Sequence, residues 1–403
     1  MNQQRLLGAD FLRAAACMMV LLHHLAFRMP ADKVPEPLQG LQGFLVMGSF
    51  GVTVFFMLSG FLLARPVWVA LDRGDPMPNL RTYALRRAAR ILPGFWLALV
   101  VSLVFSITLG NSVFDGQQAI RFVAGFLLLA DWHWMTLFPV DNNGPLWSIG
   151  FEVTSYVLLP FCLAALFALG VKSWRARLAW IGVVALALLA HWMVVQWAPI
   201  DEVGRGWKHG LLGGAKAWMP RFNPLGFFAI FALGALASGV QVKFAGMRHW
   251  LFDVIGLGGI VGAGMTMAAH IGGLNEGYGW FGIPYAFPWM PVAVGTALVG
   301  LPSSVLAGRL LDNSISRFIA AISFGIYIWH FLVIWLLERL VPPSFDMGRD
   351  DAWTIWLWSS AATVLISFAI ATVSFYALER PVVRWARTLE PRPARRAAAP
   401  ASA

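Results

Sequence analysis

The sequence places an imidazole and a carboxylate inside two separate apolar stretches, and these side chains are the commonest carriers of acid–base chemistry. His24 lies near the end of the first stretch, and Glu152 lies in a later one, in the run that begins at Asn143. If the later segment enters the membrane from the side on which the first one leaves, the two side chains sit at comparable depth and can form an acid–base pair. The alternative is a glutamate that is satisfied by a neighbouring helix.

Arg13 is expected to share a helix face with His24. The two residues are eleven positions apart, which at about 100° per residue leaves them about 20° apart around the helix and about 16 Å apart along it. Asp10 lies three residues before Arg13 and can pair with it. Ionisable groups at membrane depth cost about 3 kcal/mol or more each, so this face is expected to have a function. The alternative is a structural Asp–Arg pair with an interfacial histidine.

Three arginines at the start of another apolar stretch can converge on one anion. Arg90 is four residues from Arg86 and three from Arg87, so the three side chains lie on neighbouring turns. Guanidinium groups suit phosphate, and the amino end of a helix adds partial positive charge. The alternative is that these arginines only anchor the helix at the membrane surface.

Four further residues are candidates for the same site. They are polar or aromatic residues inside apolar runs, namely Ser59, Trp147, Ser148 and His330. Ser59 can line a channel or be satisfied by its own helix, and a lone histidine within a membrane is as often a structural hydrogen-bonding group as a catalyst. No metal site is predicted, because the two cysteines of the chain both sit within apolar runs.

The composition predicts an all-α bundle of membrane-spanning helices. Apolar residue types make up 59% of the 403 residues and charged types only 12%, which is about half the usual charged share of a globular protein. The net charge of +10 does not indicate nucleic-acid binding, because the basic residues gather at the ends of apolar segments, where they orient a protein in the lipid bilayer.

Charge at the segment ends predicts about ten crossings and two cytoplasmic termini. Eleven apolar stretches lie near residues 8–28, 44–65, 88–109, 119–137, 146–169, 177–198, 224–240, 250–271, 287–306, 317–339 and 353–379. Arginines crowd the connection after the second stretch and the carboxyl-terminal tail, and both regions are therefore placed in the cytoplasm. Two cytoplasmic termini require an even number of crossings. The stretch 119–137, which is short and carries Asp131 and His133, is expected to be re-entrant or buried in protein.

Two segments outside the crossings have expected roles. The connection 199–222 falls on the extracytoplasmic side and holds charges of both signs, so it is either an ordinary solvated loop or a surface for an anionic acceptor. Residues 1–389 are predicted to form one membrane domain, and residues 390–403 a disordered basic cytoplasmic tail.

These motifs, in this order, resemble the integral-membrane acyltransferase family, often called acyltransferase family three. The resemblance covers nearly the whole chain. It rests on Asp10-Phe-Leu-Arg13 followed by His24, on the glycine-rich run Gly48–Phe61, on Arg87-Ala-Ala-Arg90-Ile-Leu-Pro93, on Leu146-Trp-Ser-Ile-Gly-Phe-Glu152, and on the runs Ser323–His330 and Tyr376–Pro381. The chain departs from the family's usual pattern at Phe11, often a glycine, and at Val153, often a second acidic residue. It shows no hydrolase-like carboxyl-terminal domain, which some members carry, so no two-step relay within one chain is expected.

The resemblance implies an O-acyltransferase that uses cytoplasmic acyl-coenzyme A, with acetyl-coenzyme A as the default donor and no metal. The acceptor would be a hydroxyl of an extracytoplasmic carbohydrate or glycosylated small molecule, and the membrane would be the bacterial inner membrane. Arg86, Arg87 and Arg90 would then hold the coenzyme phosphates. Arg13 would receive the pantetheine end or neutralise charge deeper in the protein. His24 would act as general base or as transient acyl carrier, and Glu152 would orient or deprotonate it.

The rival interpretation is a proton-coupled transporter, because buried Arg, Glu and His also mark such carriers. Against it, the sequence shows neither two-half symmetry nor paired broken helices of the kind that inverted repeats produce. Coenzyme A release from acyl-coenzyme A would distinguish the enzyme from the carrier.

Overall fold

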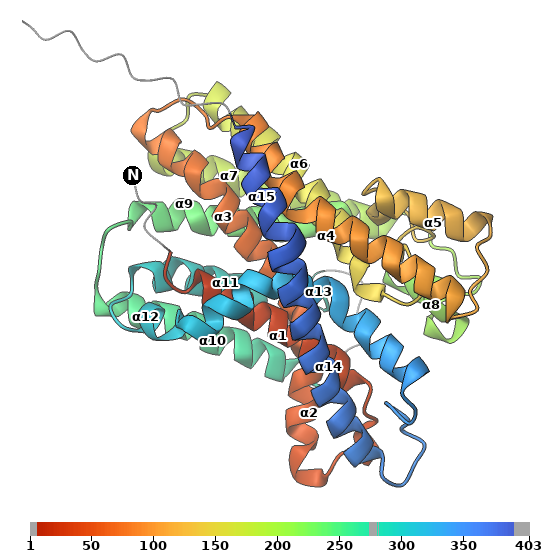
Figure 1. Cartoon of the computed structure of the whole chain (residues 1–403). Helices are drawn as coiled ribbons and strands as arrows, with labels where there is room; N and C mark the ends of the chain where they lie inside the picture. The colour runs from red at the N-terminus through yellow and green to blue at the C-terminus, as the bar shows by residue number, and fades with distance from the viewer. Residues whose placement is uncertain (1–5, 274–279, 281, 391–403) are drawn as a thin grey trace, which may run out of the picture.

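The computed structural model of the chain describes residues 6–273, 280 and 282–390, and every regular element within them is a helix. Nine of the helical segments in this described part are long and apolar enough to cross a membrane (Figure 1). Their principal helices are α1 (Ala9–Phe27), α3 (Gly51–Arg73), α4 (Leu80–Thr108), α6 (Trp147–Ala168), α7 (Ser173–Trp197), α9 (Pro224–Lys243), α10 (Trp250–Ala269), α13 (Ser314–Leu340) and α14 (Ala352–Ser374). The prediction of an all-α membrane bundle is confirmed.

The tenth predicted crossing is shorter than expected. The stretch 287–306 forms α11 (Trp289–Gly300), which continues as a 3₁₀ turn to Ser303. At 1.5 Å per residue these fifteen residues span only about 22 Å, less than the hydrocarbon core of about 30 Å. Gly259 of α10 lies directly against the backbone of Ala293 and Ala297. The helix α11 therefore runs back along α10, and the backbones of the two helices are in close contact.

Contacts between segment ends place both ends of the described chain at the same end of the bundle. Leu7, just before α1, lies against Gly308, which follows α11 closely in the chain. At the carboxyl end of the chain, Glu390 binds Arg86 at the start of α4 through two hydrogen bonds of 2.7 and 2.6 Å. Because α4 follows α3 after a short connection, this pair lies near Asp72 at the end of α3. In the described part of the chain, nine helices are long enough to cross and the shorter α11 makes a tenth pass through the bundle, where ten full crossings were predicted from charge.

The stretch 119–137 does not form a full crossing, as predicted. It contributes most of α5 (Gly116–Phe126), which is eleven residues long, and an irregular segment follows it. That segment turns into the bundle, since Asn142 and Asn143 are 1% and 0% exposed. Their side-chain amides donate to the carbonyl oxygens of Ser102 and Ile328, each at 2.9 Å, within α4 and α13. Gln118 and Arg121 of α5 donate to the backbone carbonyl oxygens of the segment at residues 139 and 138, so carbonyls of this non-helical backbone are satisfied by the protein.

Glycines bring three of the helices into close contact. A Cβ at Gly60 of α3 would overlap the carbonyl oxygen of Phe231 in α9, and a Cβ at Gly234 of α9 would overlap the carbonyl oxygen of Met57 in α3. Gly51 lies in the same way against Ala16 of α1. Small residues allow such approach where lipid supplies no hydrophobic force between helices. The glycine-rich run therefore serves tight helix packing.

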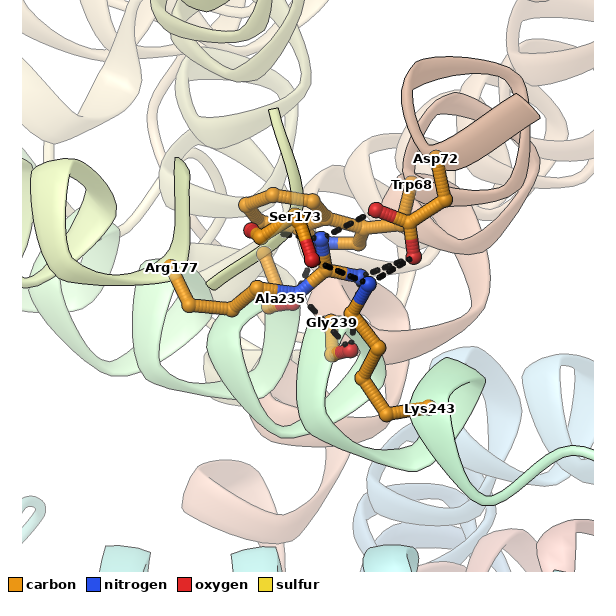
Figure 2. Close-up of polar contacts among 7 residues, drawn as sticks. All are labelled: Trp68, Asp72, Ser173, Arg177, Ala235, Gly239 and Lys243. Carbon is orange, nitrogen blue, oxygen red and sulfur yellow. Dashed lines mark hydrogen bonds and ion pairs between the residues drawn. The ribbon is translucent and has the colours of Figure 1, made fainter. Parts of the chain in front are cut away.

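A buried ion cluster joins α3, α7 and α9 at the end that carries the two chain ends (Figure 2). Arg177 donates to both carboxylate oxygens of Asp72 at 2.6 and 2.8 Å, and Lys243 approaches the same carboxylate at 3.0 Å. The guanidinium also donates to the Gly239 carbonyl and lies 4.5 Å from the centre of the Trp68 ring. The Arg177 side chain is only 3% exposed, and nearly all of its donors are used.

The last two helices pack along the outside of α13 and α4. After α14 the chain makes a π-helical turn at Phe375–Glu379 and continues as α15 (Arg380–Thr388). In Figure 1 these elements form one long continuous helix, in which α14 packs along α13 and α15 lies on α4. Of the predicted tail 390–403, only Glu390 is described, and residues 391–403 lie outside the described residues.

Candidate active site

A small polar cavity lies where α1, α3, α4, α6 and α13 meet. It has a volume of about 90 Å³, and its lining includes Arg13, Arg87, Arg90 and Glu152 together with Ser59, Tyr156 and Tyr327. The lining therefore holds three cations and one carboxylate. An excess of positive charge in an enclosed space favours an anionic ligand.

Of the three arginines predicted to act together, Arg87 and Arg90 line this cavity. The Arg90 guanidinium lies 3.3 Å from Glu379, whose side chain is only 1% exposed, and Arg87 lies 6.0 Å from the centre of the Tyr156 ring. Arg86 is bound to Glu390 outside the cavity, and the Arg86 guanidinium holds the pKa of that carboxyl below its usual range. Of the three arginines, Arg87 and Arg90 therefore lie at the cavity and Arg86 does not.

A pair of histidines lies at the end of α1 that is away from the cavity. The Nε2 atom of His330 lies 2.9 Å from Nδ1 of His24, and Nδ1 of His330 lies 2.9 Å from the carbonyl oxygen of Ile326. His330 is fully buried and His24 is half-buried. Nothing in the sequence pairs these two residues, because they are 306 positions apart.

This geometry selects the tautomer of His24 when both rings are neutral. A carbonyl oxygen only accepts, so Nδ1 of His330 carries the hydrogen and Nε2 of His330 is an acceptor. Nδ1 of His24 must then donate to it. Nε2 of His24 is left with its lone pair, which is what a base or a nucleophile needs.

Glu152 is not paired with His24, which corrects the expected acid–base pair. Its carboxylate accepts from Ser59 Oγ at 3.1 Å and from the Tyr156 hydroxyl. The physical reason is the inward turn of the preceding segment, since Asn143 already lies at the depth of Ile328. Nine residues further along α6, Glu152 is about 13 Å deeper. It therefore sits with Arg13 rather than with His24.

The remaining candidates divide between the cavity and its surroundings. Ser148 lines the cavity and its hydroxyl lies 2.6 Å from the hydroxyl of Tyr327. Asp10 lies within electrostatic reach of Arg13, as the spacing predicted. Trp147 instead packs in an aromatic cluster with Phe151, Trp218 and others, away from the cavity. It supports α6 and does not line the site.

Tyr327 connects the cavity with the histidine pair. Its ring lines the cavity, and its centre is 6.2 Å from the centre of the His330 ring, one turn further along α13. Arg13 lines the cavity together with Tyr327 of α13, and His24 contacts His330 of the same helix. Both residues of α1 therefore lie on the face that the sequence predicted. Tyr156, Glu379 and Tyr327 were not among the site residues predicted from the sequence, although Glu379 and Tyr327 lie in two of the motif runs named there. Tyr156 lies four residues after Glu152, which is the local pattern that could have indicated it.

An acyltransferase domain family matches residues 6–372, nearly the whole chain. The chain belongs to this acyltransferase family. The resemblance that the motifs predicted is thereby confirmed. No solved structure matches the chain.

Three relatives show what this chain is similar to. The peptidoglycan O-acetyltransferase OatA of Listeria monocytogenes is 24% identical over 93% of this chain and 55% of its own length. Nodulation protein 10 of Rhizobium leguminosarum bv. viciae is 24% identical over 93% of this chain and 92% of its own. The acyltransferase MdmB of Streptomyces mycarofaciens is 25% identical over 82% and 78%. The chain thus spans about half the length of the peptidoglycan O-acetyltransferase and most of the other two.

Proposed function

We propose that this protein transfers an acyl group, acetyl by default, from cytoplasmic acyl-coenzyme A to a hydroxyl of an extracytoplasmic glycan. The observation that carries the proposal is the alignment of an arginine-lined cavity and a polarised histidine along one face of α1. Family membership and the relatives named as peptidoglycan O-acetyltransferases support acyl transfer to carbohydrate over the alternative of a transporter. The bacterial inner membrane is the proposed location.

The cavity is proposed to hold the donor. Arg87 and Arg90 face it from α4, and charge-assisted hydrogen bonds from guanidinium groups suit phosphate. Its volume of about 90 Å³ is well below the ~300 Å³ of a typical small-molecule site, so it fits part of a slender chain rather than a whole coenzyme. The pantetheine arm would extend past Arg13 toward Tyr327 and carry the thioester to the histidine pair.

His24 is proposed to perform the chemistry with its Nε2 atom. As a general base, Nε2 takes the proton of the acceptor hydroxyl while the hydroxyl oxygen attacks the thioester carbonyl carbon. The C–S bond then breaks, and the coenzyme thiolate receives the proton back from the imidazolium. As an acyl carrier, Nε2 attacks the carbonyl carbon first, the C–S bond breaks and the coenzyme leaves as a thiolate. The acceptor hydroxyl then attacks the acyl-imidazolium, the C–N bond breaks, and the hydroxyl proton passes to the thiolate. In both cases His330 stabilises the positive charge that His24 acquires.

The test is acetyl-coenzyme A cleavage by the purified protein in detergent, with chitotetraose as acceptor. We measure free coenzyme A with a thiol reagent and acetylated sugar by mass spectrometry for the wild type, His24→Ala and the neighbouring control His23→Ala. His23 is directed instead to the Val46 carbonyl. The wild type and His23→Ala are expected to form product, and His24→Ala to lose at least about 10²-fold in rate. Equal rates for the two variants, or no thioester cleavage by the wild type, would refute the proposal.

A further inference from the structure

The larger of the two cavities described has no role in the mechanism above. It has a volume of about 540 Å³, within the range of roughly 300–1,000 Å³ that small-molecule sites occupy. Its walls come from residues 131–134, the end of α7, the connection that follows it and the start of α9. Sequence reasoning treated residues 199–222 as a solvated loop or an anion surface, and the structure folds part of this connection into a cavity wall.

This cavity opens at the end of the bundle that also holds His24. The start of α7 and the end of α9 meet at the Asp72 cluster, so the end of α7 and the start of α9 lie at the opposite end. His24 likewise lies near the end of α1, far from the start that packs beside Gly308. With the proposed orientation, both face the extracytoplasmic side.

Aromatic side chains form one part of the cavity lining. Trp132 is 62% exposed although it lines a cavity, so one ring face is available to a ligand. The Trp134 ring is held in place by Lys216, whose ammonium lies 4.4 Å from the ring centre. Lys216 also binds Asp201, and this hydrogen bond lowers the pKa of the Asp201 carboxyl. The lining holds two carboxylates, Asp131 and Asp201, and two cations, Arg205 and Lys216, so it has no excess of positive charge to favour an anionic ligand.

Hydrogen-bonding groups form another part of the lining. Asp131 is fully buried, and its Oδ2 accepts from Thr154 at 2.8 Å. Its Oδ1 is buried as well and lies against Gly150 of α6, so this carboxylate supports the cavity wall and is not in contact with the open space. Burial raises the pKa of Asp131 to about 6. The Asn223 side chain is used by His191 and by the backbone N–H groups of Leu225 and Gly226, whereas the Asp201 side chain lines the same cavity and is 41% exposed.

This combination matches the chemistry of a pyranose ring. A sugar has a face of C–H groups that packs on an aromatic ring and a rim of hydroxyls that donate to carboxylate and amide oxygens. Relatives of the chain are named as acetyltransferases of peptidoglycan, a glycan. We propose that this cavity binds a neutral pyranose unit of the acceptor glycan, with Trp132 as the stacking face and the exposed Asp201 carboxylate as hydrogen-bond acceptor. This inference rests on the proposed function for the identity of the glycan.

The experiment measures equilibrium binding of chitotetraose to the full chain in lipid nanodiscs by isothermal titration calorimetry. The variants are Trp132→Ala, Trp132→Phe and the control Trp250→Ala, which removes an equally exposed tryptophan, 63% exposed, at the opposite end of the bundle. The expected result is a Kd raised roughly tenfold by Trp132→Ala, partly restored by Trp132→Phe and unchanged by Trp250→Ala.

Two outcomes would overturn the inference. If the wild-type protein binds no chitotetraose, the proposed sugar site is contradicted. If the Trp132→Ala variant binds as tightly as the wild type, Trp132 is only an interfacial anchor. Acetyl-coenzyme A cleavage is measured in parallel on the same samples. Cleavage that persists while sugar binding fails contradicts only the glycan site, whereas sugar binding that persists without cleavage contradicts only the proposed transfer reaction.

Discussion

The tautomer of His24 is set by its neighbour His330. The Ile326 carbonyl orients His330, and His330 in turn holds the Nδ1 hydrogen of His24. His330 touches neither proposed substrate, so it is a positioning residue. Its burial means that the pair can form only after α1 and α13 have packed together.

Replacement of His330 should therefore change rate and leave donor binding intact. For His330→Leu we expect kcat to fall roughly 10²-fold, the lower end of what a positioned acid–base group contributes. The KM for acetyl-coenzyme A should not change, because Arg87 and Arg90 are untouched. His330→Gln, whose side-chain oxygen can accept from His24, should recover part of the loss. Steady-state kinetics check this, and a shared loss of kcat in both variants would assign His330 a merely structural role.

At the scale of elements, the depth of each helix start decides which residues meet. The segment that precedes α6 is drawn inward by hydrogen bonds from Asn142 and Asn143. As a result Glu152 reaches the arginine end of the bundle, where it binds Ser59 and Tyr156. Apolar length alone cannot reveal such an inward turn.

The clamp between α3, α7 and α9 should contribute to stability rather than to activity. Arg177→Met keeps a side chain of similar length and leaves Asp72 with only Lys243 as charged partner. Removing one partner of a buried pair costs about 3–5 kcal/mol. We expect a loss of this size in an unfolding titration with dodecyl sulfate in mixed micelles, with normal activity per folded molecule. Arg175→Met, at an exposed position two residues away, is the control, and an equal effect of the two would argue against the clamp.

At the scale of the whole molecule, ten passes bring both ends of the described chain to one end of the bundle. The arginine cavity is nearer this end, and the histidine pair and the larger cavity lie toward the other. A donor and an acceptor from opposite sides of a membrane could therefore meet inside one domain. The side on which each end lies is predicted from the basic connections.

Thiol labelling checks this orientation. In a chain with Cys17 and Cys162 replaced by alanine, single cysteines are introduced as Asp75→Cys and Glu202→Cys, both at exposed positions. A membrane-impermeant maleimide applied to intact bacterial cells should label Glu202→Cys at once and Asp75→Cys only after the membrane is opened. The reverse pattern would invert the proposed orientation, and equal labelling of both in intact cells would contradict their placement at opposite ends.

The sequence by itself was sufficient for the fold class, the family and the helix face shared by Arg13 and His24. These follow from local properties, since apolar length selects membrane helices and the 3.6-residue period places side chains around them. The start of α4 with Arg87 and Arg90 was likewise recognisable from spacing within one turn.

Only the tertiary structure decided the partners. The bonds from His24 to His330 and from Arg90 to Glu379 join residues about 300 positions apart, and helix packing rather than local pattern brings them together. The short α11 and the inward turn before α6 depend in the same way on neighbouring helices that satisfy their backbone. Depth within the bundle is a property of the assembled protein, and this is why Glu152 was assigned to the wrong partner from sequence.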